Sequence, residues 1–318
     1  MTTTVRTVRA MGTDCSVTCY APGESGQLLA DVAVARIELL EDCWSRFREH
    51  SELNRLNARA GSGPVCCSAD LIRLVATMKA AWEMTGGLFD PTVLTSVKAA
   101  GYDADFATVI ARGAIAASSA ALVVEPAPGM AGVVIDEELS TVALPSGVDI
   151  DPGAIGKGLA ADIIAGEIMG AGADGVLVNL GGDIVFAGTP GDDPAWLIAI
   201  EDERVGVDHP ERVFRQLEFE PGIERGAVAT STTLKRVWGN GRHHLIDPRT
   251  GDVSRGDLVQ ATVVDDFGWR AEAAATAALL MGAGRAPQWL KDHDLVSVLL
   301  TRDAVIELDD TRIGATHD

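Results

Sequence analysis

The sequence predicts an α+β fold with mixed, largely antiparallel sheets and flanking helices. Stretches of alternating β-branched and polar residues follow one another across short, glycine-containing turns, which is typical of antiparallel strands. Amphipathic stretches at helical spacing lie between them, but no regular strand–helix–strand repeat occurs. The 318 residues allow either one large domain or two closely packed lobes.

The N-terminal part is predicted to contain a hairpin followed by helices. Residues 4–10 and 14–20 alternate in polarity around Met11-Gly-Thr13, which indicates two strands joined by a tight turn. The apolar spacing that follows predicts helices over residues 27–48, 51–57 and 68–84, the last two beginning at the capping residues Ser51 and Ser68.

The rest of the chain alternates between strand and helix patterns. Residues 98–140 are rich in alanine, glycine and serine, and we expect surface excursions there around one strand at 132–136. Helices are expected at 157–170 and 269–282. Strands are expected at 175–180, 183–187, 196–200, 215–219, 226–231, 258–265, 295–300 and 304–308.

The composition limits the partners and the compartment. The formal charge is −20, from 26 basic and 46 acidic residues, so the chain repels nucleic acid and anionic membranes, and an anionic substrate requires local cations or a metal. The five cysteines are odd in number and form no C-x-x-C motif, which favours reduced thiols. Neither a membrane span nor a signal-peptide pattern occurs, so we expect a cytoplasmic protein.

Two glycine-rich turns could approach a ligand closely. Residues 153–158 open a predicted helix and place Lys157 in its first turn, where a lysine can neutralise phosphate charge; an ordinary helix start with an exposed lysine is the alternative. Asp151, just before this helix, could cap it or bind a nucleotide. The glycine pair at 181–182 fits either a ligand approach or a simple hairpin.

A third segment carries groups that can move a proton. His243 and His244 precede a turn-forming stretch, 247–251, that contains Asp247 and Arg249. Histidine can donate or accept a proton near neutral pH, so His244 is a candidate general base. The alternative is that one ring is packed and the other exposed, without a catalytic role.

Glu272 and Thr276 are the candidate metal ligands. They lie four residues apart on a predicted helix, so their side chains face the same way. A carboxylate and a hydroxyl, together with backbone carbonyls, suit a hard cation such as Mg²⁺. Glutamate and threonine are also common helix residues, so the spacing alone leaves an ordinary helix face possible. The chain has no H-E-x-x-H motif and no cysteine–histidine cluster, which disfavours zinc.

These pieces occur together in an order that resembles the ApbE family of FAD:protein FMN transferases. The resemblance covers most of the chain except residues 98–140, 190–225 and the C-terminal tail. Its motifs are Met11-Gly-Thr13, Ser45-Arg-Phe-Arg48, Ser51-Glu-Leu53 with Asn57, Gly86-Gly-Leu-Phe-Asp-Pro-Thr92, Asp149-Ile-Asp-Pro-Gly-Ala-Ile-Gly-Lys-Gly158, Val178-Asn-Leu-Gly-Gly-Asp183, Val228-Ala-Thr-Ser231, His244-Leu-Ile-Asp-Pro-Arg-Thr-Gly251 and Ala271-Glu-Ala-Ala-Ala-Thr276.

The resemblance implies a single α+β domain over residues 1–318, with variable insertions near 98–140 and 190–225, that binds FAD. It implies a magnesium-dependent reaction in which a threonine hydroxyl of an acceptor protein attacks the FMN phosphorus and AMP leaves. His244 is expected to accept the proton of the threonine hydroxyl, and Asp247 is expected to orient His244. Matching positions imply that FAD is contacted by Met11, Phe47, Leu88, Phe89, Asp90, Asp151, Lys157 and Leu245, and Mg²⁺ by the carbonyl of Ala154 and the side chains of Glu272 and Thr276.

Three departures from the family pattern keep alternatives open. The family usually has aspartate where Glu272 stands, which could change the magnesium geometry. Thr230-Ser-Thr232 replaces a common Thr-Ser-Gly, which we expect to narrow a loop at the site, and the family's lipoprotein signal is missing, so the acceptor is expected inside the cell. The alternatives are an FAD pyrophosphatase that uses water in place of threonine, and a non-catalytic flavin-binding protein.

Overall fold

The computed structural model describes residues 2–112, 125–206, 208–209, 212–219, 223–239, 241–308 and 313–316. The chain forms two compact units made of interleaved segments. The first unit comprises Met1–Glu38, Lys157–Leu234 and Asp257–Asp318, and the second comprises Leu39–Gly156 and Lys235–Gly256. The single domain implied by the resemblance stays a prediction. Parts of its two insertions, residues 113–124, 207, 210–211 and 220–222, lie outside the described residues.

The first unit is built on an eight-stranded sheet, in which every neighbouring pair of strands is antiparallel. The predicted α+β class is therefore confirmed, and the predicted strands occur with ends shifted by two residues at most. The strand order is β1 (Thr2–Ala10), β2 (Thr13–Ala21), β6 (Gly175–Leu180), β7 (Ile184–Gly188), β10 (Arg225–Thr232), β13 (Leu258–Asp265), β14 (Val296–Thr301) and β15 (Val305–Leu308).

A two-residue turn joins β1 to β2. Ala10 pairs with Thr13, and the intervening Met11 and Gly12 have φ angles of 51° and 70°. Positive φ at both positions is the type I′ geometry that suits the twist of a hairpin. Methionine rarely adopts this conformation, because its Cβ crowds the backbone, so the hairpin holds Met11 at a local energetic cost.

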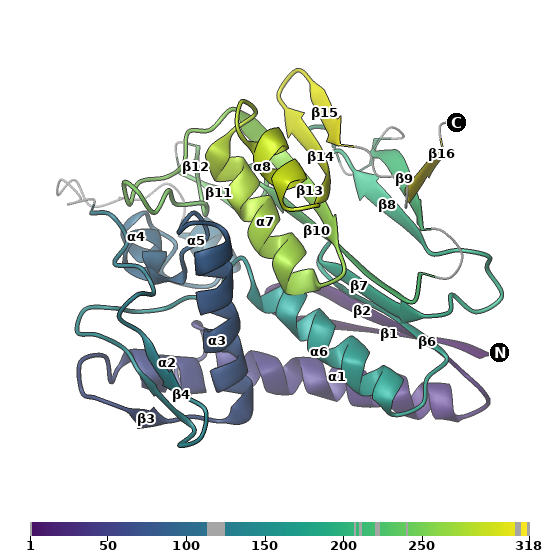
Figure 1. Cartoon of the computed structure of the whole chain (residues 1–318), viewed down its shortest axis with the longest axis horizontal. Coiled ribbons are helices and arrows are strands. Elements are labelled where there is room, and N and C mark those ends of the chain that lie inside the picture. The colour runs from purple at the N-terminus through teal and green to yellow at the C-terminus, as the bar shows by residue number, and fades with distance from the viewer. Residues whose placement is uncertain are drawn as a thin grey trace. The chain divides into compact units, whose positions relative to one another are not determined.

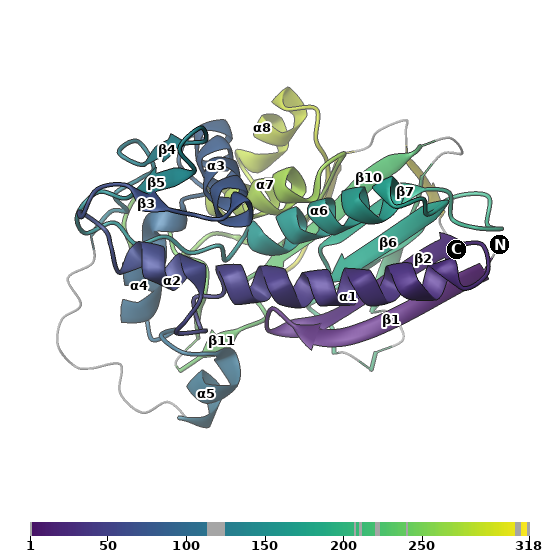
Figure 2. The same cartoon turned by 90° about the horizontal axis from the view of Figure 1, so that it is seen from below.

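Helices α6 (Gly156–Gly170) and α7 (Gly268–Met281) lie on one face of this sheet and meet near the start of each helix (Figures 1 and 2). The other face packs against a three-stranded sheet of β8 (Leu197–Glu201), β9 (Val213–Phe219) and β16 (Ile313–Thr316), in the order β16-β9-β8. Phe186 of β7 is fully buried in this second interface, where it contacts the rings of Trp196 and Phe219. Helix α8 (Ala286–Asp292), which the sequence patterns did not predict, follows α7.

Glycines allow α6 and α7 to touch backbone to backbone. A Cβ at Gly158 would lie 2.3 Å from the carbonyl oxygen of Gly268, and a Cβ at Gly268 would lie 2.7 Å from that of Gly158. Asp162 of α6 holds the same junction, because its carboxylate accepts hydrogen bonds from Gly268 N and Trp269 N, both at 3.0 Å. It therefore caps the start of α7, and burial raises the pKa of this carboxyl.

The second unit consists mainly of short helices. The predicted caps Ser51 and Ser68 are confirmed: each side chain accepts a hydrogen bond from the backbone N–H three residues on. Two small sheets, β3-β5-β4 and β11-β12, complete the unit. Its elements are α2 (Glu52–Asn57), β3 (Val65–Cys66), α3 (Ala69–Met84), the 3₁₀ helix η1 (Pro91–Val93), α4 (Leu94–Ala99), α5 (Phe106–Ala111), β4 (Val134–Asp136), β5 (Thr141–Ala143), β11 (Val237–Trp238) and β12 (Arg242–His243).

Helix α1 (Ser25–Trp44) begins in the segment of the first unit and ends in that of the second. The predicted helix over 27–48 is thus confirmed with an earlier end. All five cysteines are free, and burial raises the pKa of Cys19 to about 11 and that of Cys43 to about 12. Within the described part of the chain no helix is long and apolar enough to cross a membrane.

The contact between α6 and α7 generates a stability prediction. Gly158→Ala should lower the free energy of unfolding by about 1–3 kcal/mol, because the added methyl group meets backbone that cannot retract freely. Gly166→Ala is the matched control on the same helix: nothing lies within 4 Å of its added Cβ, so alanine should be neutral or should stabilise by up to about 1 kcal/mol. Urea unfolding followed by circular dichroism measures both, and equal stabilities would contradict the close contact.

Candidate functional site

Two polar side chains interrupt the apolar surface of α7. From Ala271 to Leu280 this helix is buried, and its other residues there are alanine and leucine. Glu272 and Thr276 are only 3% and 5% exposed to solvent. A buried carboxylate is costly unless it is paired, so their presence in such a helix indicates a role other than packing. The alternative of an ordinary solvated helix face is therefore wrong.

Glu272 is held at the first turn of α6. Its Oε2 accepts a hydrogen bond from Gly158 N at 2.8 Å, and its Oε1 lies 3.0 Å from Lys157 Nζ. A carboxylate is favoured at a helix N-terminus, where backbone N–H groups lack partners within the helix. The glycine-rich turn predicted to approach a phosphate thus presents one of its N–H groups to a carboxylate of the protein itself.

Lys157 contacts a second buried carboxylate. Its ammonium donates a hydrogen bond to Asp183 Oδ2 as well as to Glu272 Oε1, and the side chain of Asp183 is 2% exposed. The other oxygen, Asp183 Oδ1, is buried and has no hydrogen-bond partner among the described residues. The alternative of an exposed lysine at an ordinary helix start is wrong, because Lys157 bridges two buried acids.

Asp183 was not among the predicted site residues. It follows a hairpin turn in which Gly181 and Gly182 have φ angles of 72° and 99°, and Leu180 N donates to Asp183 O at 2.9 Å. Asn179 Oδ1 fixes the turn by accepting from Gly182 N at 2.9 Å. The glycine pair therefore forms the hairpin that was one of its two predicted alternatives. The only signal for Asp183 in the sequence was its place at the end of the glycine motif.

Thr276 faces β10. Its Oγ1 lies 3.2 Å from Ser231 Oγ, while Thr230 and Thr262 share a hydrogen bond across β10 and β13. We expected Thr230-Ser-Thr232 to narrow a loop, and this is wrong, because all three residues belong to β10. Thr232 Oγ1 donates to Val259 O at 2.9 Å, as an ordinary residue at a strand end can.

The donor set of this cluster fits a hard cation. Glu272 and Thr276 offer a carboxylate and a hydroxyl, the oxygen ligands that Mg²⁺ prefers, and the partnerless Oδ1 of Asp183 adds acceptor capacity nearby. Across the described ranges, no group of three or more histidine, cysteine, aspartate or glutamate residues could hold a metal. The cluster of Lys157, Asp183, Glu272 and Thr276 is called the α6–α7 cluster below.

In the second unit, Asp151 belongs to a structured turn. Its Oδ1 accepts from Gly153 N at 2.9 Å, and its Oδ2 lies 3.1 Å from Arg46 Nε. The guanidinium of Arg46 also stacks on two rings, 4.1 Å from the centroid of Phe47 and 4.5 Å from that of Tyr102. Phe47 is 44% exposed, so one aromatic surface next to a fixed charge pair is open to a ligand. The predicted flavin contacts of Phe47 and Asp151 stay predictions.

Ala154 follows this turn with a φ angle of 117°, in a region that favours glycine. Such strained residues cluster at functional sites, because the surrounding structure must hold them against an energetic cost. Backbone strain at Ala154 is the kind found where a carbonyl group is oriented for a functional role. The predicted role of that carbonyl as a metal ligand stays a prediction.

The predicted flavin-lining segment 88–90 is largely interior. Phe89 and Asp90 are buried, and Leu88 is half-buried. Asp90 caps η1: its Oδ1 accepts from Thr92 N at 2.8 Å and from Thr92 Oγ1 at 2.6 Å, and its Oδ2 accepts from Trp82 Nε1 at 3.2 Å. Burial raises the pKa of this carboxyl, although the hydrogen bonds oppose the change. The carboxylate thus has a structural task, and the predicted flavin contacts of Leu88, Phe89 and Asp90 stay predictions.

The adjacent histidines differ in their surroundings. His243 Nδ1 accepts a hydrogen bond from Leu245 N at 3.3 Å, which leaves Nε2, 3.1 Å from Ser254 O, to donate. Burial lowers the pKa of His243, so this ring is a neutral, structural group. His244 is half-buried and precedes the buried Leu245. Both rings are half-buried, so the alternative of one packed and one exposed ring does not describe this pair.

Asp247 stabilises the turn after the histidines. Its carboxylate forms a bidentate ion pair with Arg249: Oδ1 lies 2.8 Å from Nε, and Oδ2 lies 2.6 Å from Nη2. Asp247 N and O also bond to Asp252 O, Thr250 N and Gly251 N, which closes the turn that the sequence predicted. Its role in orienting His244 stays a prediction.

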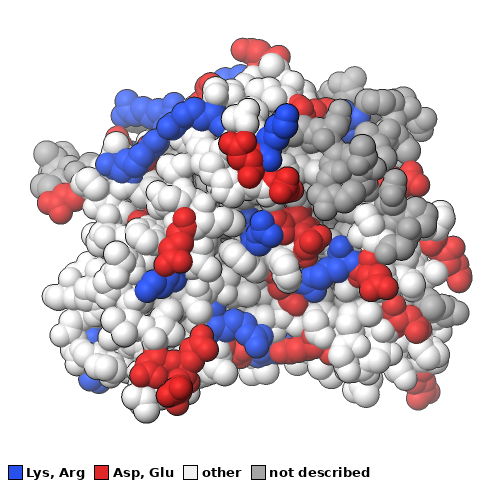
Figure 3. Space-filling view, viewed as in Figure 1, with Lys and Arg blue, Asp and Glu red and all other residues white. Residues whose placement is uncertain are grey.

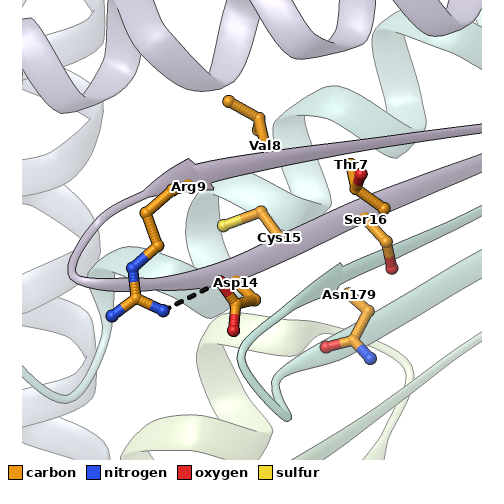
Figure 4. A pocket seen from close by; sticks show the side chains of 7 residues that line it. All are labelled: Thr7, Val8, Arg9, Asp14, Cys15, Ser16 and Asn179. Carbon is orange, nitrogen blue, oxygen red and sulfur yellow. Dashed lines mark hydrogen bonds and ion pairs between the residues drawn. The ribbon is translucent and has the colours of Figure 1, made fainter.

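A depression of about 530 Å³ opens on β1, β2 and β6 in the first unit (Figure 4). Its lining includes Thr7, Ser16 and Asn179, and the exposed pair of Arg9 and Asp14 lies at its edge with 2.9 Å between Nη1 and Oδ1. None of the predicted flavin or metal residues lines it. Acidic and basic side chains both occur on the face drawn in Figure 3.

Comparison with known proteins places the chain in one family. The model of the ApbE family matches residues 11–300. A Treponema pallidum protein named FAD:protein FMN transferase is 27% identical over 312 residues, 96% of this chain and 84% of that protein. A Vibrio cholerae protein of the same name is 28% identical over 253 residues, 78% of this chain and 72% of that protein.

Solved structures show the same fold. The crystal structure of the ApbE protein from Thermotoga maritima superposes with a TM-score of 0.81 at 22% identity, over 97% of each chain. The flavin transferase ApbE from Vibrio cholerae superposes with a TM-score of 0.72 at 23% identity, over 99% of this chain and 97% of that one. Because the family model spans most of the sequence, the chain belongs to the ApbE family.

Proposed function

We propose that this chain is a magnesium-dependent FAD:protein FMN transferase, which cleaves FAD, joins FMN through a phosphoester bond to a threonine of an acceptor protein and releases AMP. The observation that carries the proposal is the α6–α7 cluster, a buried set of oxygen donors and one lysine in a chain of the ApbE family. Its relatives in Treponema pallidum and Vibrio cholerae bear the name FAD:protein FMN transferase.

The charge of the chain makes a cation necessary. A protein of −20 has to bind a pyrophosphate that is itself negative. A magnesium ion held by Glu272 and Thr276, with the carbonyl of Ala154 as the resemblance implies, would supply the charge that such a substrate needs. Lys157 is the basic side chain of the cluster and would pair with a phosphate oxygen of FAD.

The transfer itself is an exchange of one phosphorus–oxygen bond for another. The threonine oxygen of the acceptor bonds to the FMN phosphorus, and the bond from this phosphorus to the oxygen bridging to AMP breaks. His244 would take the threonine proton, while His243 is neutral and engaged by Leu245 and Ser254. The exposed ring of Phe47, next to Arg46, would provide apolar surface for the flavin ring of FAD.

Mass spectrometry of a candidate acceptor protein tests the proposal. After incubation with FAD, Mg²⁺ and this chain, the acceptor should gain the mass of one FMN less one water. A Thr→Val variant of the acceptor should gain nothing, because it lacks the attacking hydroxyl. Release of FMN and AMP at the same rate with and without the acceptor would identify an FAD pyrophosphatase instead, and retention of intact FAD would identify a flavin-binding protein.

Ligand preference provides a further prediction. The chain should bind FAD more tightly than FMN, because Met11, Asp151 and Lys157 are expected to engage parts of the nucleotide beyond the flavin ring. Titration followed by flavin fluorescence, with Mg²⁺ present, gives both dissociation constants. Equal affinities would mean that the AMP half of FAD makes no net contact with the protein.

The two histidines should respond differently to substitution. His244→Ala should slow FMN transfer by roughly 10²–10⁴, the range for loss of a general base, and should leave FAD affinity within a few-fold of the parental value. His243→Ala is the matched control and should lower the free energy of unfolding by about 1–3 kcal/mol, since it leaves Leu245 N without its acceptor. A His244→Ala chain that transfers FMN at the parental rate would assign the proton to another group.

The response of Glu272 to substitution should depend on its charge. Glu272→Gln should raise the Mg²⁺ concentration for half-maximal transfer by about ten-fold or more, while Glu272→Asp, which keeps the carboxylate, should stay closer to the parental value. Because Glu272 is buried and bonded to Gly158 N, both variants should also unfold at lower urea concentrations. The measurement is transfer rate against Mg²⁺ concentration, and identical curves for Glu272→Gln and the parent would place the metal elsewhere.

A further inference from the structure

We propose that Asp183 is a further carboxylate ligand of the divalent cation, beside Glu272, and that the ammonium of Lys157 is a built-in counter-ion that the cation displaces. The inference rests on the magnesium requirement of the proposed function. It adds to that function a residue outside the expected ligand set, and an order of events at the α6–α7 cluster.

The charges of the cluster do not balance without another cation. Asp183 and Glu272 carry two negative charges on side chains that are 2% and 3% exposed, and Lys157 supplies one positive charge between them. Buried carboxylates need paired positive charge, since water no longer solvates them. A divalent cation in place of the ammonium would make the pair of carboxylates neutral.

The hydrogen bonds of the two carboxylates are also unequal. Both oxygens of Glu272 have donors, from Gly158 N and Lys157 Nζ. Asp183 has a donor only at Oδ2, and its buried Oδ1 has none among the described residues. A buried carboxylate oxygen without a partner is rare in native proteins, and one standard explanation is an ion that belongs there. A bound metal ion would give Oδ1 the partner that it lacks.

The position of Asp183 is set by the backbone. It directly follows the hairpin turn at Gly181 and Gly182, and it immediately precedes β7, which pairs with β6 on one side and β10 on the other. Glu272 is likewise fixed, by Gly158 N at the start of α6. Both carboxylates are therefore held by rigid elements, which is how protein ligands to a metal are oriented before the ion arrives.

Lys157, in contrast, can leave. Its side chain is 22% exposed, against 2% for Asp183, so its flexible stem has an open side. Once a cation replaces the ammonium between the carboxylates, the lysine becomes available for a phosphate oxygen. This order reconciles the two ion pairs of Lys157 with its expected contact to FAD, and it predicts that the cation and FAD assist each other in binding.

Binding of Mn²⁺ to the full chain without flavin, followed by electron paramagnetic resonance, tests the inference. Asp183→Asn should weaken Mn²⁺ binding by about ten-fold or more, because it removes a charged ligand. Lys157→Met should strengthen it by about ten-fold, because it removes the competing ammonium while keeping the apolar stem. Two controls make the same changes in charge at exposed positions: Glu167→Gln on α6 matches Asp183→Asn, and Lys291→Met on α8 matches Lys157→Met. Both controls should bind Mn²⁺ as the parent does.

The two opposite shifts distinguish the inference from simpler ones. If Lys157→Met binds Mn²⁺ no more tightly than the parent does, the lysine is not a counter-ion and the inference fails. If Asp183→Asn binds as the parent does, Asp183 is not a ligand and the inference fails as well. A parental chain that binds no Mn²⁺ at about 10 mM also overturns it, since this concentration exceeds the range of weak protein sites.

Thermal unfolding covers variants that fold poorly. Lys157→Met leaves two buried carboxylates unpaired, so its melting temperature in EDTA should fall, and Mg²⁺ should raise it by more than it raises that of the parent. An equal Mg²⁺ effect in the two proteins counts against the inference. FMN transfer is measured separately. If the parent transfers FMN but both variants bind Mn²⁺ as the parent does, only the inference is contradicted. If both variants show the predicted shifts in Mn²⁺ affinity but the parent transfers no FMN, only the proposed function is contradicted.

Discussion

The contact between the starts of α6 and α7 is the constraint on which the α6–α7 cluster of the first unit depends. Gly158 and Gly268 touch there backbone to backbone, which brings the N–H groups of α6 to the side chains of α7. Glu272 can then reach Gly158 N, and Lys157 can reach Glu272. Asp162 and Arg225 brace the same junction from the α6 side and from β10. Glycine is thus required at position 158 because two helices have to approach closely there.

The burial of α7 explains why its two polar residues are informative. Its alanines let it lie flat against β10 and β13, and the close packing leaves no room for solvated side chains. A carboxylate in that position costs stability unless something compensates for its charge. The fold therefore accepts an energetic cost at one place, as proteins commonly do where they bind or react. The left-handed residues Met11 and Ala154 are local costs of the same kind.

Much of the fold could be predicted from the sequence, because many of its strands alternate in polarity and helices α2 and α3 begin at recognisable serine caps. Ser51 and Ser68 show that a single hydroxyl can mark a helix start correctly. The short helices α4, α5 and α8 have too few turns for a clear periodicity, so no pattern predicted them. Asp183 was missed for a different reason. Its importance arises from Lys157 and Glu272, which lie 26 positions before it and 89 positions after it along the chain.

The interleaved units have a consequence for biosynthesis. Strand β2 is complete at Ala21, but its partner β6 begins only at Gly175, after the long segment of the second unit. At typical rates of synthesis, roughly 150 residues take about 10–30 s to emerge, and long-range pairing of this kind folds slowly. During that interval the apolar side of the N-terminal hairpin, with Cys15, Val17 and Cys19, has no sheet to join. The N-terminal hairpin of the first unit therefore leaves the ribosome well before the strand that it pairs with, while the segment of the second unit is still being made.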